Sequence, residues 1–278
     1  MDKSKISIII FAIILVIVFI CLTVVKNKLT DDYSFKIYFF NAGKADAILI
    51  SNNDHYIMID TGKEELSDEI LTYFRTNNIT KLDYLIITHF DKDHVGSAST
   101  VIDNIEIGNV LQSNVPKESE YYNNYITSLA NKNITPITVS GDYEISIDDM
   151  NIVVNGPTEI FEKDESNNSS LITSVIYKNN SFLFTGDAEN ERIKDYLENH
   201  TSEYDFIKIP YHGNYLKQLS KLLETVNPNY AVITSSDEEL EDDETIELLN
   251  NLKIKYYLTR KGPIVIKSNG DNIHIEQN

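Results

Sequence analysis

The chain has 278 residues and a net charge of −19, with 24 basic and 43 acidic side chains. Hydrophobic residues make up 42% of it, which suits one large α/β domain or two small ones. Residues 30–278 carry 20 basic and 42 acidic side chains, a balance of −22 that excludes a broad basic surface for holding nucleic acid. Any activity on nucleic acid would therefore depend on bound metal ions and a local patch.

An uncharged run of 20 residues, 6–25, lies near the N-terminus. As a helix, a run of this length would span about 30 Å, the thickness of a bilayer core. The run exceeds the apolar core of a signal peptide, and no small-residue cleavage site follows it. We therefore expect an uncleaved membrane anchor in residues 1–29. A cleaved signal peptide, which would leave the protein secreted, is the alternative.

Charges on either side of the run indicate its orientation. Two lysines flank each end, and the α-amino group with Asp31 and Asp32 favours an N-terminus inside the cell. We expect a single-pass protein of the bacterial cell membrane that contacts the membrane through residues 6–25, with residues 30–278 outside the cytoplasm. The single cysteine, Cys21, lies in the run, so no intramolecular disulfide can form.

Beyond a polar tether at residues 26–32, short apolar runs separated by turn residues predict a strand-rich chain. The predicted strands cover residues 35–40, 45–51, 56–60, 82–88, 107–111, 134–139, 149–154, 171–177, 181–185, 206–210 and 230–234, and three short strands follow at the C-terminus. Apolar residues at helical spacing predict helices over residues 66–74, 118–131, 188–199 and 215–226, and another that ends at 248–252. Residues 158–170 are polar and loop-like, and 237–244 form an acidic run.

A faint internal repeat links the two parts of the chain. Residues 56–62 resemble 182–187, and residues 82–89 resemble 204–212. In each half, one apolar strand ends in Asp beside Gly, and a later one ends in His. The repeat predicts two β-rich halves packed face to face, with helices outside and ligands gathered where strand ends meet.

The apolar run 82–88 ends in a dense cluster of ionisable side chains, His89, Asp91, Asp93 and His94. Folding does not require such a cluster. The commonest reason for these side chains to share a site is that they bind a pair of divalent metal ions. His89 and Asp91 are two positions apart, so in extended backbone they point the same way and can share one ion. Asp93 and His94 lie beyond the bend and can face a second ion.

Three residues elsewhere in the chain complete the candidate site. Asp187 stands between a strand and a helix, where a carboxylate could bridge two ions, and His212 ends another apolar strand. Asp60 is a candidate for orienting a ligand histidine through a hydrogen bond. Each alone would more often be a surface histidine, a helix cap or a turn residue. Together with the turn at 89–94 they predict a metal site, whereas His55, His200 and His274 are interpreted as surface or packing residues.

Five segments carry a resemblance to a known family, at residues 41–50, 88–94, 167–171, 185–189 and 208–213. The sequence resembles the metallo-β-lactamase fold superfamily, whose ligand turn reads His-x-His-x-Asp-His. Within it, the chain is similar to the C-terminal hydrolase-like domain of the competence DNA-uptake protein ComEC and its stand-alone relatives. The similarity runs from about residue 34 to 268. It implies an α/β fold, a four-layer αββα sandwich behind the N-terminal transmembrane helix, with residues 30–278 as one hydrolase domain.

The chain departs from the family pattern at several positions. Asp91 replaces the second histidine of the ligand turn, and 168–170 replace the usual third-motif histidine. Ser97 replaces a glycine, Tyr211 replaces one histidine of a pair, and the acidic run 237–244 stands where relatives have His-Pro-His. These changes weaken the zinc site that β-lactamases use, so we do not expect a true β-lactamase.

The resemblance and the ligand set predict metal-assisted hydrolysis, with a phosphodiesterase or nuclease-like activity. One or two divalent ions are expected, and the carboxylate-rich ligands make manganese as suitable as zinc. The predicted metal ligands are His89, Asp91, Asp93, His94, Asp187 and His212. Asp93 and Asp91 are the predicted catalytic residues, with Asp60 in support.

Asn168, Ser169 and Tyr211 are predicted to contact the substrate. That substrate should contain a phosphodiester, and the net acidity disfavours DNA. One alternative is a hydrolase of an extracellular envelope phosphodiester or a small molecule. The other is a membrane-tethered binding module with a degenerate site. No protein partner can be inferred.

Overall fold

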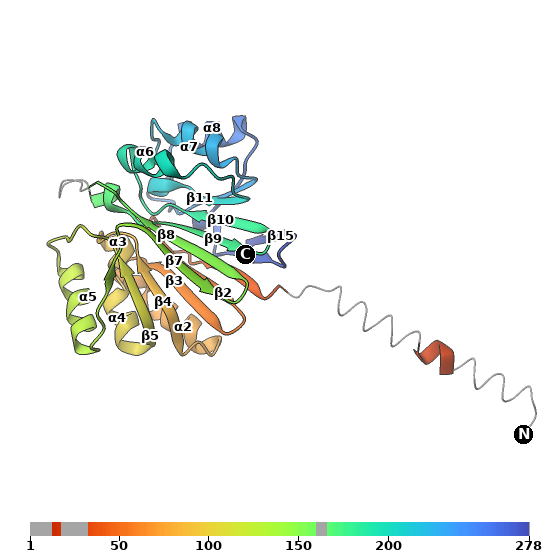
Figure 1. Cartoon of the computed structure of the whole chain (residues 1–278), viewed down its shortest axis with the longest axis horizontal. Coiled ribbons are helices and arrows are strands. Elements are labelled where there is room, and N and C mark those ends of the chain that lie inside the picture. Colours follow the sequence, from red (N-terminus) through yellow and green to blue (C-terminus); the bar gives the residue numbers. More distant parts are fainter. Residues whose placement is uncertain (1–12, 18–32, 160–165, 278) are drawn as a thin grey trace, which may run out of the picture.

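The computed structural model describes residues 13–17, 33–159 and 166–277. Two β-sheets face each other across the middle of the molecule, and helices cover their outer faces (Figure 1). The repeat in the sequence correctly predicted this two-sheet α/β sandwich. The two sheets are not strictly the two halves of the chain, because the last two strands return to the first sheet.

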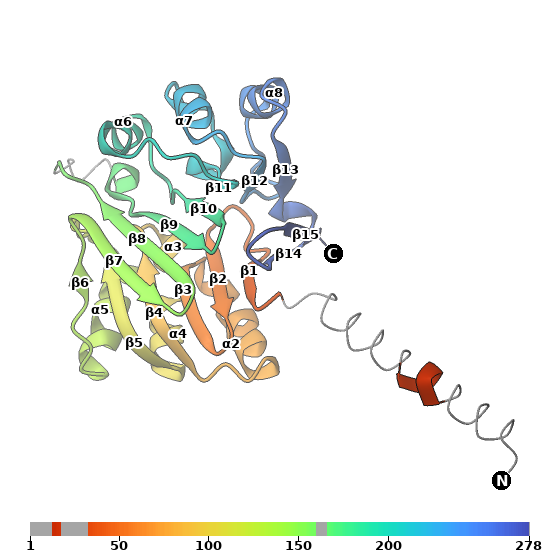
Figure 2. The ribbon, with the colours of Figure 1, turned by 45° about the vertical axis from the view of Figure 1, so that its right-hand side comes forward.

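The first sheet has the strand order β15-β14-β1-β2-β3-β4-β5-β6 (Figure 2). Its strands are β1 (Phe35–Phe39), β2 (Ala47–Asn52), β3 (His55–Thr61), β4 (Lys81–Ile87), β5 (Glu106–Gln112), β6 (Ile137–Thr138), β14 (Ile264–Ser268) and β15 (Ile273–Gln277). β3, β4 and β5 run parallel to one another, which brings their carboxyl ends to one edge of the sheet.

The second sheet has the order β13-β12-β11-β10-β9-β8-β7. Its strands are β7 (Gly141–Ile147), β8 (Met150–Gly156), β9 (Ile172–Tyr177), β10 (Asn180–Phe184), β11 (Phe206–Lys208), β12 (Tyr230–Ile233) and β13 (Lys255–Leu258). β10 to β13 are parallel. Ligands in α/β folds commonly bind outside the carboxyl ends of parallel strands, and both sheets provide such ends.

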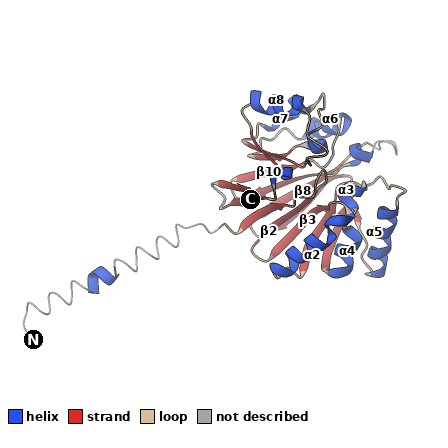
Figure 3. Cartoon of the chain, turned by 180° about the vertical axis from the view of Figure 1, so that it is seen from behind, coloured by secondary structure: helices blue, strands red, loops and turns tan. Residues whose placement is uncertain are grey.

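Helices pack on the outside of each sheet (Figure 3). The first sheet is covered by α2 (Ser67–Thr76), α4 (Ala98–Asn104) and α5 (Glu120–Asn131), while the short α3 (Lys92–Val95) follows β4. The second is covered by α6 (Asn190–Asn199), α7 (Leu219–Val226) and α8 (Asp243–Asn251). Between the sheets, alternate residues of β1 point inward, and Phe35 packs on Phe182 with ring centroids 5.0 Å apart.

Most predicted elements are present within a few residues of their expected bounds, and the differences have local causes. β7 was not predicted, because it is an edge strand whose Asp142 and Glu144 interrupt the apolar pattern. α3 and α4 occupy the region where the sequence indicated only a bend. α7 begins at Leu219 rather than 215, because residues 210–213 form a separate tight turn.

The predicted membrane anchor falls mostly outside the described residues, which include only 13–17 of the run 6–25. In the described part of the chain, no helix combines the length and apolar character that crossing a membrane requires. This finding contradicts the predicted single-pass membrane localisation. The prediction took the uncharged run to be one continuous helix, and the described residues contain no such helix. The predicted domain boundary between residues 29 and 30 also lies outside them.

Arg192 of helix α6 is fully buried against the second sheet. Its guanidinium donates to the backbone oxygens of Ser170 at 2.9 Å and Asn155 at 2.8 Å, and to the carboxylate of Asp195 at 2.8 Å. Burial lowers the pKa of Arg192 to about 10, and the charge of Asp195 opposes that shift. Arg192 therefore ties the helix to the loop that carries Ser170.

We expect Arg192→Lys to lower the free energy of unfolding by about 3 kcal/mol, because an ammonium cannot satisfy acceptors arranged around a planar guanidinium. Urea denaturation followed by circular dichroism measures the change. Lys194→Ala, an exposed change on the same helix, should stay within about 0.5 kcal/mol of the wild type. Equal effects of the two substitutions would contradict the assigned role of Arg192.

Candidate metal centre

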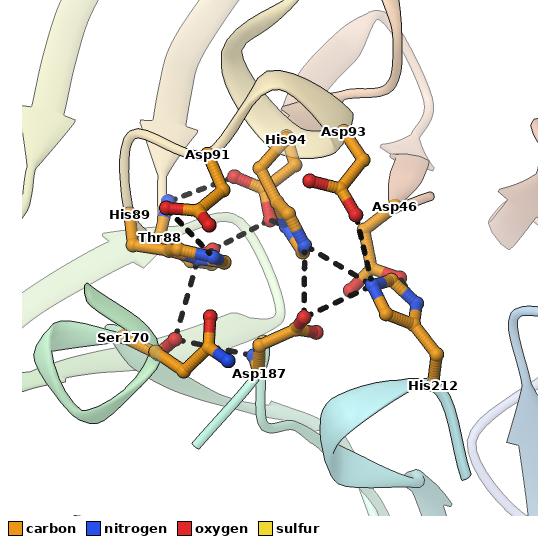
Figure 4. Close-up of polar contacts among 12 residues, drawn as sticks. Asp46, Thr88, His89, Asp91, Asp93, His94, Ser170, Asp187 and His212 are labelled. Carbon is orange, nitrogen blue, oxygen red and sulfur yellow. Dashed lines mark hydrogen bonds and ion pairs between the residues drawn. The ribbon is translucent and has the colours of Figure 1, made fainter. Parts of the chain in front are cut away.

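Turns at the carboxyl ends of three strands carry the predicted ligands (Figure 4). His89 and Asp91 lie in the turn after β4, and Asp93 and His94 lie on α3. Asp187 follows β10, and His212 lies in the turn after β11. Residues far apart in the sequence therefore meet where the carboxyl ends of parallel strands from the two sheets come together.

Four of the six predicted metal ligands converge on one point. The Nε2 atom of His94 lies 3.4 Å from Nε2 of His212 and 3.4 Å from Oδ2 of Asp187. His212 Nε2 lies 3.0 Å from the same carboxylate oxygen and 3.5 Å from Oδ2 of Asp93. One ligand atom from each of the four residues falls within 4.8 Å of the others. Two imidazoles and two carboxylates at this spacing form a candidate metal-binding cluster.

The rings of His94 and His212 are each oriented by a hydrogen bond at Nδ1, the ring nitrogen that faces away from the cluster. His94 Nδ1 lies 2.7 Å from Oδ2 of Asp60, a carboxylate that can only accept, so Nδ1 carries the proton. His212 Nδ1 lies 2.9 Å from Oγ1 of Thr234, whose own hydroxyl donates to Asp46 at 2.7 Å. With Nδ1 as the donor, each neutral ring presents the lone pair of Nε2 to the cluster.

The turn at Tyr211-His212-Gly213 directs the second histidine into the cluster. All three residues have positive φ, 51° at Tyr211 and 54° at His212. A left-handed conformation costs a non-glycine residue about 1–3 kcal/mol, and such residues gather at functional sites. Asp60, with φ of 55°, is a third example in the same site.

The cluster holds more negative than positive charge. The carboxylates of Asp46, Asp60 and Asp187 are buried, and that of Asp93 is about a quarter exposed. One buried ammonium, Lys208 Nζ, faces them at 2.6 Å from Asp46 and 3.5 Å from Asp187. Buried charge is costly unless it is compensated, and with both imidazoles neutral, as metal ligation requires, a divalent ion would compensate two of the three remaining negative charges. The donor set therefore fits a divalent cation.

The same groups shift one another's pKa values. Burial disfavours the charged form of His94, but the carboxylates of Asp187 and Asp60 outweigh burial and raise its pKa well above the ordinary value. The pKa of Asp187 is held well below its usual range, against burial, by His212 and His94. A metal ion at this point would take the place of the protons on the two imidazoles.

The other two predicted ligands, His89 and Asp91, lie beside the cluster. His89 is fully buried, and its Nε2, 3.9 Å from Oδ1 of Asp91, has no hydrogen-bond partner among the described residues. Burial, together with the charge of His94, lowers the pKa of His89 to about 4, so its ring is neutral at neutral pH. Oδ1 of Asp91 accepts from Lys117 Nζ at 2.6 Å and from the hydroxyl of Ser166. Metal binding by His89 and Asp91 stays a prediction.

A cavity of about 280 Å³ opens over the cluster. It is lined by Lys44, Lys63, Asp91, Lys92, Asp93, Asn167, Asp187, Tyr211, His212, Asn214 and Glu239. Three lysines face four carboxylates at its walls, so the lining is close to balanced in charge, unlike the acidic chain as a whole. A divalent ion bound by the cluster would make the cavity positive, which would favour an anionic ligand.

Of the three predicted substrate contacts, only Tyr211 lines the cavity. Asn168 is buried, and its side-chain oxygen accepts from the backbone N–H of Arg192 in α6. Ser169 is buried too, and its hydroxyl donates to the backbone oxygen of Ser166 at 2.6 Å. These internal bonds give Asn168 and Ser169 packing roles behind the cavity, and their neighbour Asn167 lines it instead.

Sequence reasoning assigned no role to Asp46, Thr234 or Lys208, which the structure places around His212 and Asp187. The sequence did contain a clue to Lys208. It is flanked by Ile207 and Ile209 within an apolar strand, and a lysine in such a strand needs a buried partner of opposite charge. The sequence contained no clue to Thr234, since its contact with His212 arises only from the pairing of β11 with β12.

We expect Asp60→Asn to weaken binding of a divalent ion about 10–100-fold, because an amide cannot serve equally as acceptor to His94 and Thr88. Isothermal titration calorimetry with manganese or zinc measures the affinity. Asp54→Asn, an exposed change in the preceding hairpin turn, is the matched control and should leave the affinity unchanged. An unaltered affinity in Asp60→Asn would show that Asp60 does not orient a ligand.

Comparison with known proteins gives matches in both sequence and fold. The profile of the Metallo-beta-lactamase superfamily matches residues 41–235. Recombination protein 2 of Haemophilus influenzae is 28% identical over 231 residues, which cover 79% of this chain and 26% of that protein. ComE operon protein 3 of Bacillus subtilis is 27% identical over 176 residues, covering 61% of this chain and 22% of that protein. The chain thus spans about a quarter of the length of these curated relatives.

Among solved structures, the metallo-beta-lactamase fold protein YhfI of Bacillus subtilis superposes with a TM-score of 0.59. The two are 9% identical, and the match covers 84% of this chain and all of YhfI. At that identity the likeness concerns the fold alone. It agrees with the two-sheet sandwich described above.

Proposed function

This chain belongs to the metallo-beta-lactamase superfamily, and on that premise we propose that it is a metal-dependent hydrolase of phosphodiester bonds. The observation that carries the proposal is the convergence of Asp93, His94, Asp187 and His212, with both Nε2 atoms directed inward. The proposed ion is zinc or manganese, since the ligands are half imidazole and half carboxylate.

A bound divalent ion would lower the pKa of water toward neutrality and polarise an oxygen of the substrate. The chain's own groups supply positioning. Asp93 lines the cavity and is about a quarter exposed, so it can orient the attacking water through a hydrogen bond, while His212 lies 3.5 Å from its Oδ2. Asp91, the other predicted catalytic residue, also lines the cavity. Tyr211 offers a hydroxyl to a substrate oxygen.

The lysines of the cavity support an anionic substrate. Lys44, Lys63 and Lys92 line the same space as the cluster, so a phosphodiester entering it would meet positive charge at the walls. Lys44 is held by a hydrogen bond of 3.1 Å to Asn214, and Lys63 lies 3.6 Å from Glu239. Fixed cations of this kind bind phosphate oxygens and stabilise charge that builds on them.

Two kinds of phosphodiester are compatible with this site. The name of the Haemophilus influenzae relative refers to recombination, which makes DNA a substrate to test. The net charge of −19 and the placement of Glu239 at the cavity favour a small diester over a long polyanionic strand. The small diester is therefore our first choice.

A binding module without catalysis is the second candidate, and Lys117 on Asp91 is the observation that favours it. One oxygen of Asp91, Oδ1, is bonded to an ammonium, whose charge offsets that of the carboxylate. A site in which Asp91 is bonded to Lys117 could bind an anion without cleaving it. Activity measurements on wild type and a ligand variant separate the two candidates.

We expect the full chain, loaded with manganese or zinc, to cleave a chromogenic phosphodiester such as bis(p-nitrophenyl) phosphate. Asp187→Ala should reduce the rate at least about 100-fold, because it removes a ligand and a charge from the centre of the cluster. Lys221→Ala, an exposed change on α7, is the control. Single-stranded and duplex DNA are assayed in parallel.

Each outcome of this assay decides between the candidates. Cleavage of the small diester alone supports our first choice, and cleavage of DNA moves the substrate to nucleic acid. Bound metal and bound substrate without turnover would favour the binding module. If the protein holds no metal and Asp187→Ala behaves like the wild type, the hydrolase proposal fails.

Lys92→Ala should raise KM for the diester about fivefold and leave kcat nearly unchanged, because an exposed ion pair contributes up to about 1 kcal/mol to binding. Lys92 lines the cavity and is itself exposed, so removing its side chain should not disturb the fold. Steady-state kinetics at low ionic strength reveals the change. A fall in kcat with constant KM would assign Lys92 to the transition state instead.

A further inference from the structure

We propose that the ammonium of Lys117 occupies the place of a second metal ion, so that this protein works with a single divalent ion. The ion would be held by Asp93, His94, Asp187 and His212, and Lys117 would supply the second positive charge beside Asp91. The inference rests on the proposed function, since it assumes that the four-residue cluster binds metal.

The contacts of Asp91 are the first argument. Its Oδ1 atom accepts from Lys117 Nζ at 2.6 Å and from the hydroxyl of Ser166. A carboxylate oxygen bonded at this distance to an ammonium forms a strong charge-assisted hydrogen bond. Lys117 comes from the segment between β5 and α5, and Ser166 comes from the segment before β9. Two separate parts of the chain thus compete with any ion for the same oxygen.

The number of remaining donors is the second argument. Once Oδ1 of Asp91 is paired with Lys117, the adjoining half-site, formed by His89 and Asp91, retains Nε2 of His89 and Oδ2 of Asp91 as its own donors, beside Oδ1 of Asp187 from the four-residue cluster. The neighbouring Ser170 hydroxyl lies 3.3 Å from the opposite ring nitrogen, Nδ1, and cannot face the same ion as Nε2. Metal sites commonly have at least three protein ligands, and the other cluster already has four. The half-site has only two ligands of its own, and the ammonium on Asp91 repels a second cation there.

The charge of Lys117 is the third argument. In two-metal hydrolases the second ion stabilises negative charge on the reacting oxygens, at about 3.5–4 Å from the first ion. Asp91 lines the cavity together with Asp93 and Asp187, and Lys117, which is not itself among the lining residues, places its charge beside that space through its bond to Asp91. A single positive charge there can perform the same electrostatic task without coordination.

Removing the ammonium should restore the second site. In Lys117→Ala, the Asp91 carboxylate is released next to the unpartnered His89 nitrogen, which lies 3.9 Å from it. We expect one manganese ion per wild-type chain and a second, weaker ion in the variant. The full chain is stripped with chelator, loaded with manganese, and measured by elemental analysis and calorimetry. Electron paramagnetic resonance should change from an isolated ion to an exchange-coupled pair.

Matched variants separate charge from other effects. Lys117→Arg keeps a cation on Asp91 and should still bind one ion. Lys92→Ala removes another cavity lysine that is not bonded to Asp91, and should also bind one. Asp91→Ala combined with Lys117→Ala should lose the second ion again. Lys117→Gln serves as a second neutral variant, and thermal melting checks that each protein is folded.

The outcomes distinguish this inference from the proposed function. Two ions in the wild-type protein, or one ion in both neutral variants, would overturn the role of Lys117 while leaving a metal-dependent diesterase possible. No ion in the wild type, with no diesterase activity, would overturn both. One ion in the wild type and two in Lys117→Ala and Lys117→Gln would support it.

Discussion

Excess buried negative charge at the meeting point of the two sheets is the constraint on which the site depends. Asp46, Asp60 and Asp187 are almost entirely removed from water, and Lys208 is the buried ammonium that faces two of them. Such an arrangement persists only if each carboxylate has hydrogen-bond donors and if a further cation offsets the remainder. The orientation of His94 and His212, the tight turn after β11 and the proposed metal ion all follow from this requirement.

The centre is asymmetric, and the asymmetry matters more for function than the superfamily membership does. On one side, two imidazoles and two carboxylates direct their free atoms to one point. On the other side, Asp91 is bonded to Lys117, and His89 has a buried nitrogen without a hydrogen-bond partner among the described residues. In the one-ion centre proposed above, a side chain of the protein would fill the second position while the fold is retained.

Local charge and net charge point in different directions in this protein. The chain as a whole is strongly acidic, whereas three lysines nearly balance the four carboxylates that line the cavity above the cluster. Long-range repulsion would discourage a polyanion, whereas the lysines together with a bound divalent ion would attract a small anion. The matched region covers about a quarter of the length of the curated relatives, so the substrates of those whole proteins are not carried over to this chain.

Sequence alone determined the two-sheet α/β fold, because apolar periodicity and the repeated strand-end motif report local preferences and burial. It also located the candidate metal turn, since His89, Asp91, Asp93 and His94 are close in the chain itself. Only tertiary structure decided what surrounds them. Lys117 reaches Asp91 across 26 positions and Thr234 reaches His212 across 22, contacts that no local pattern encodes. Asn168 and Ser169 showed the same limit, because both side chains are buried, where Asn168 accepts from Arg192 of α6 and Ser169 donates to Ser166.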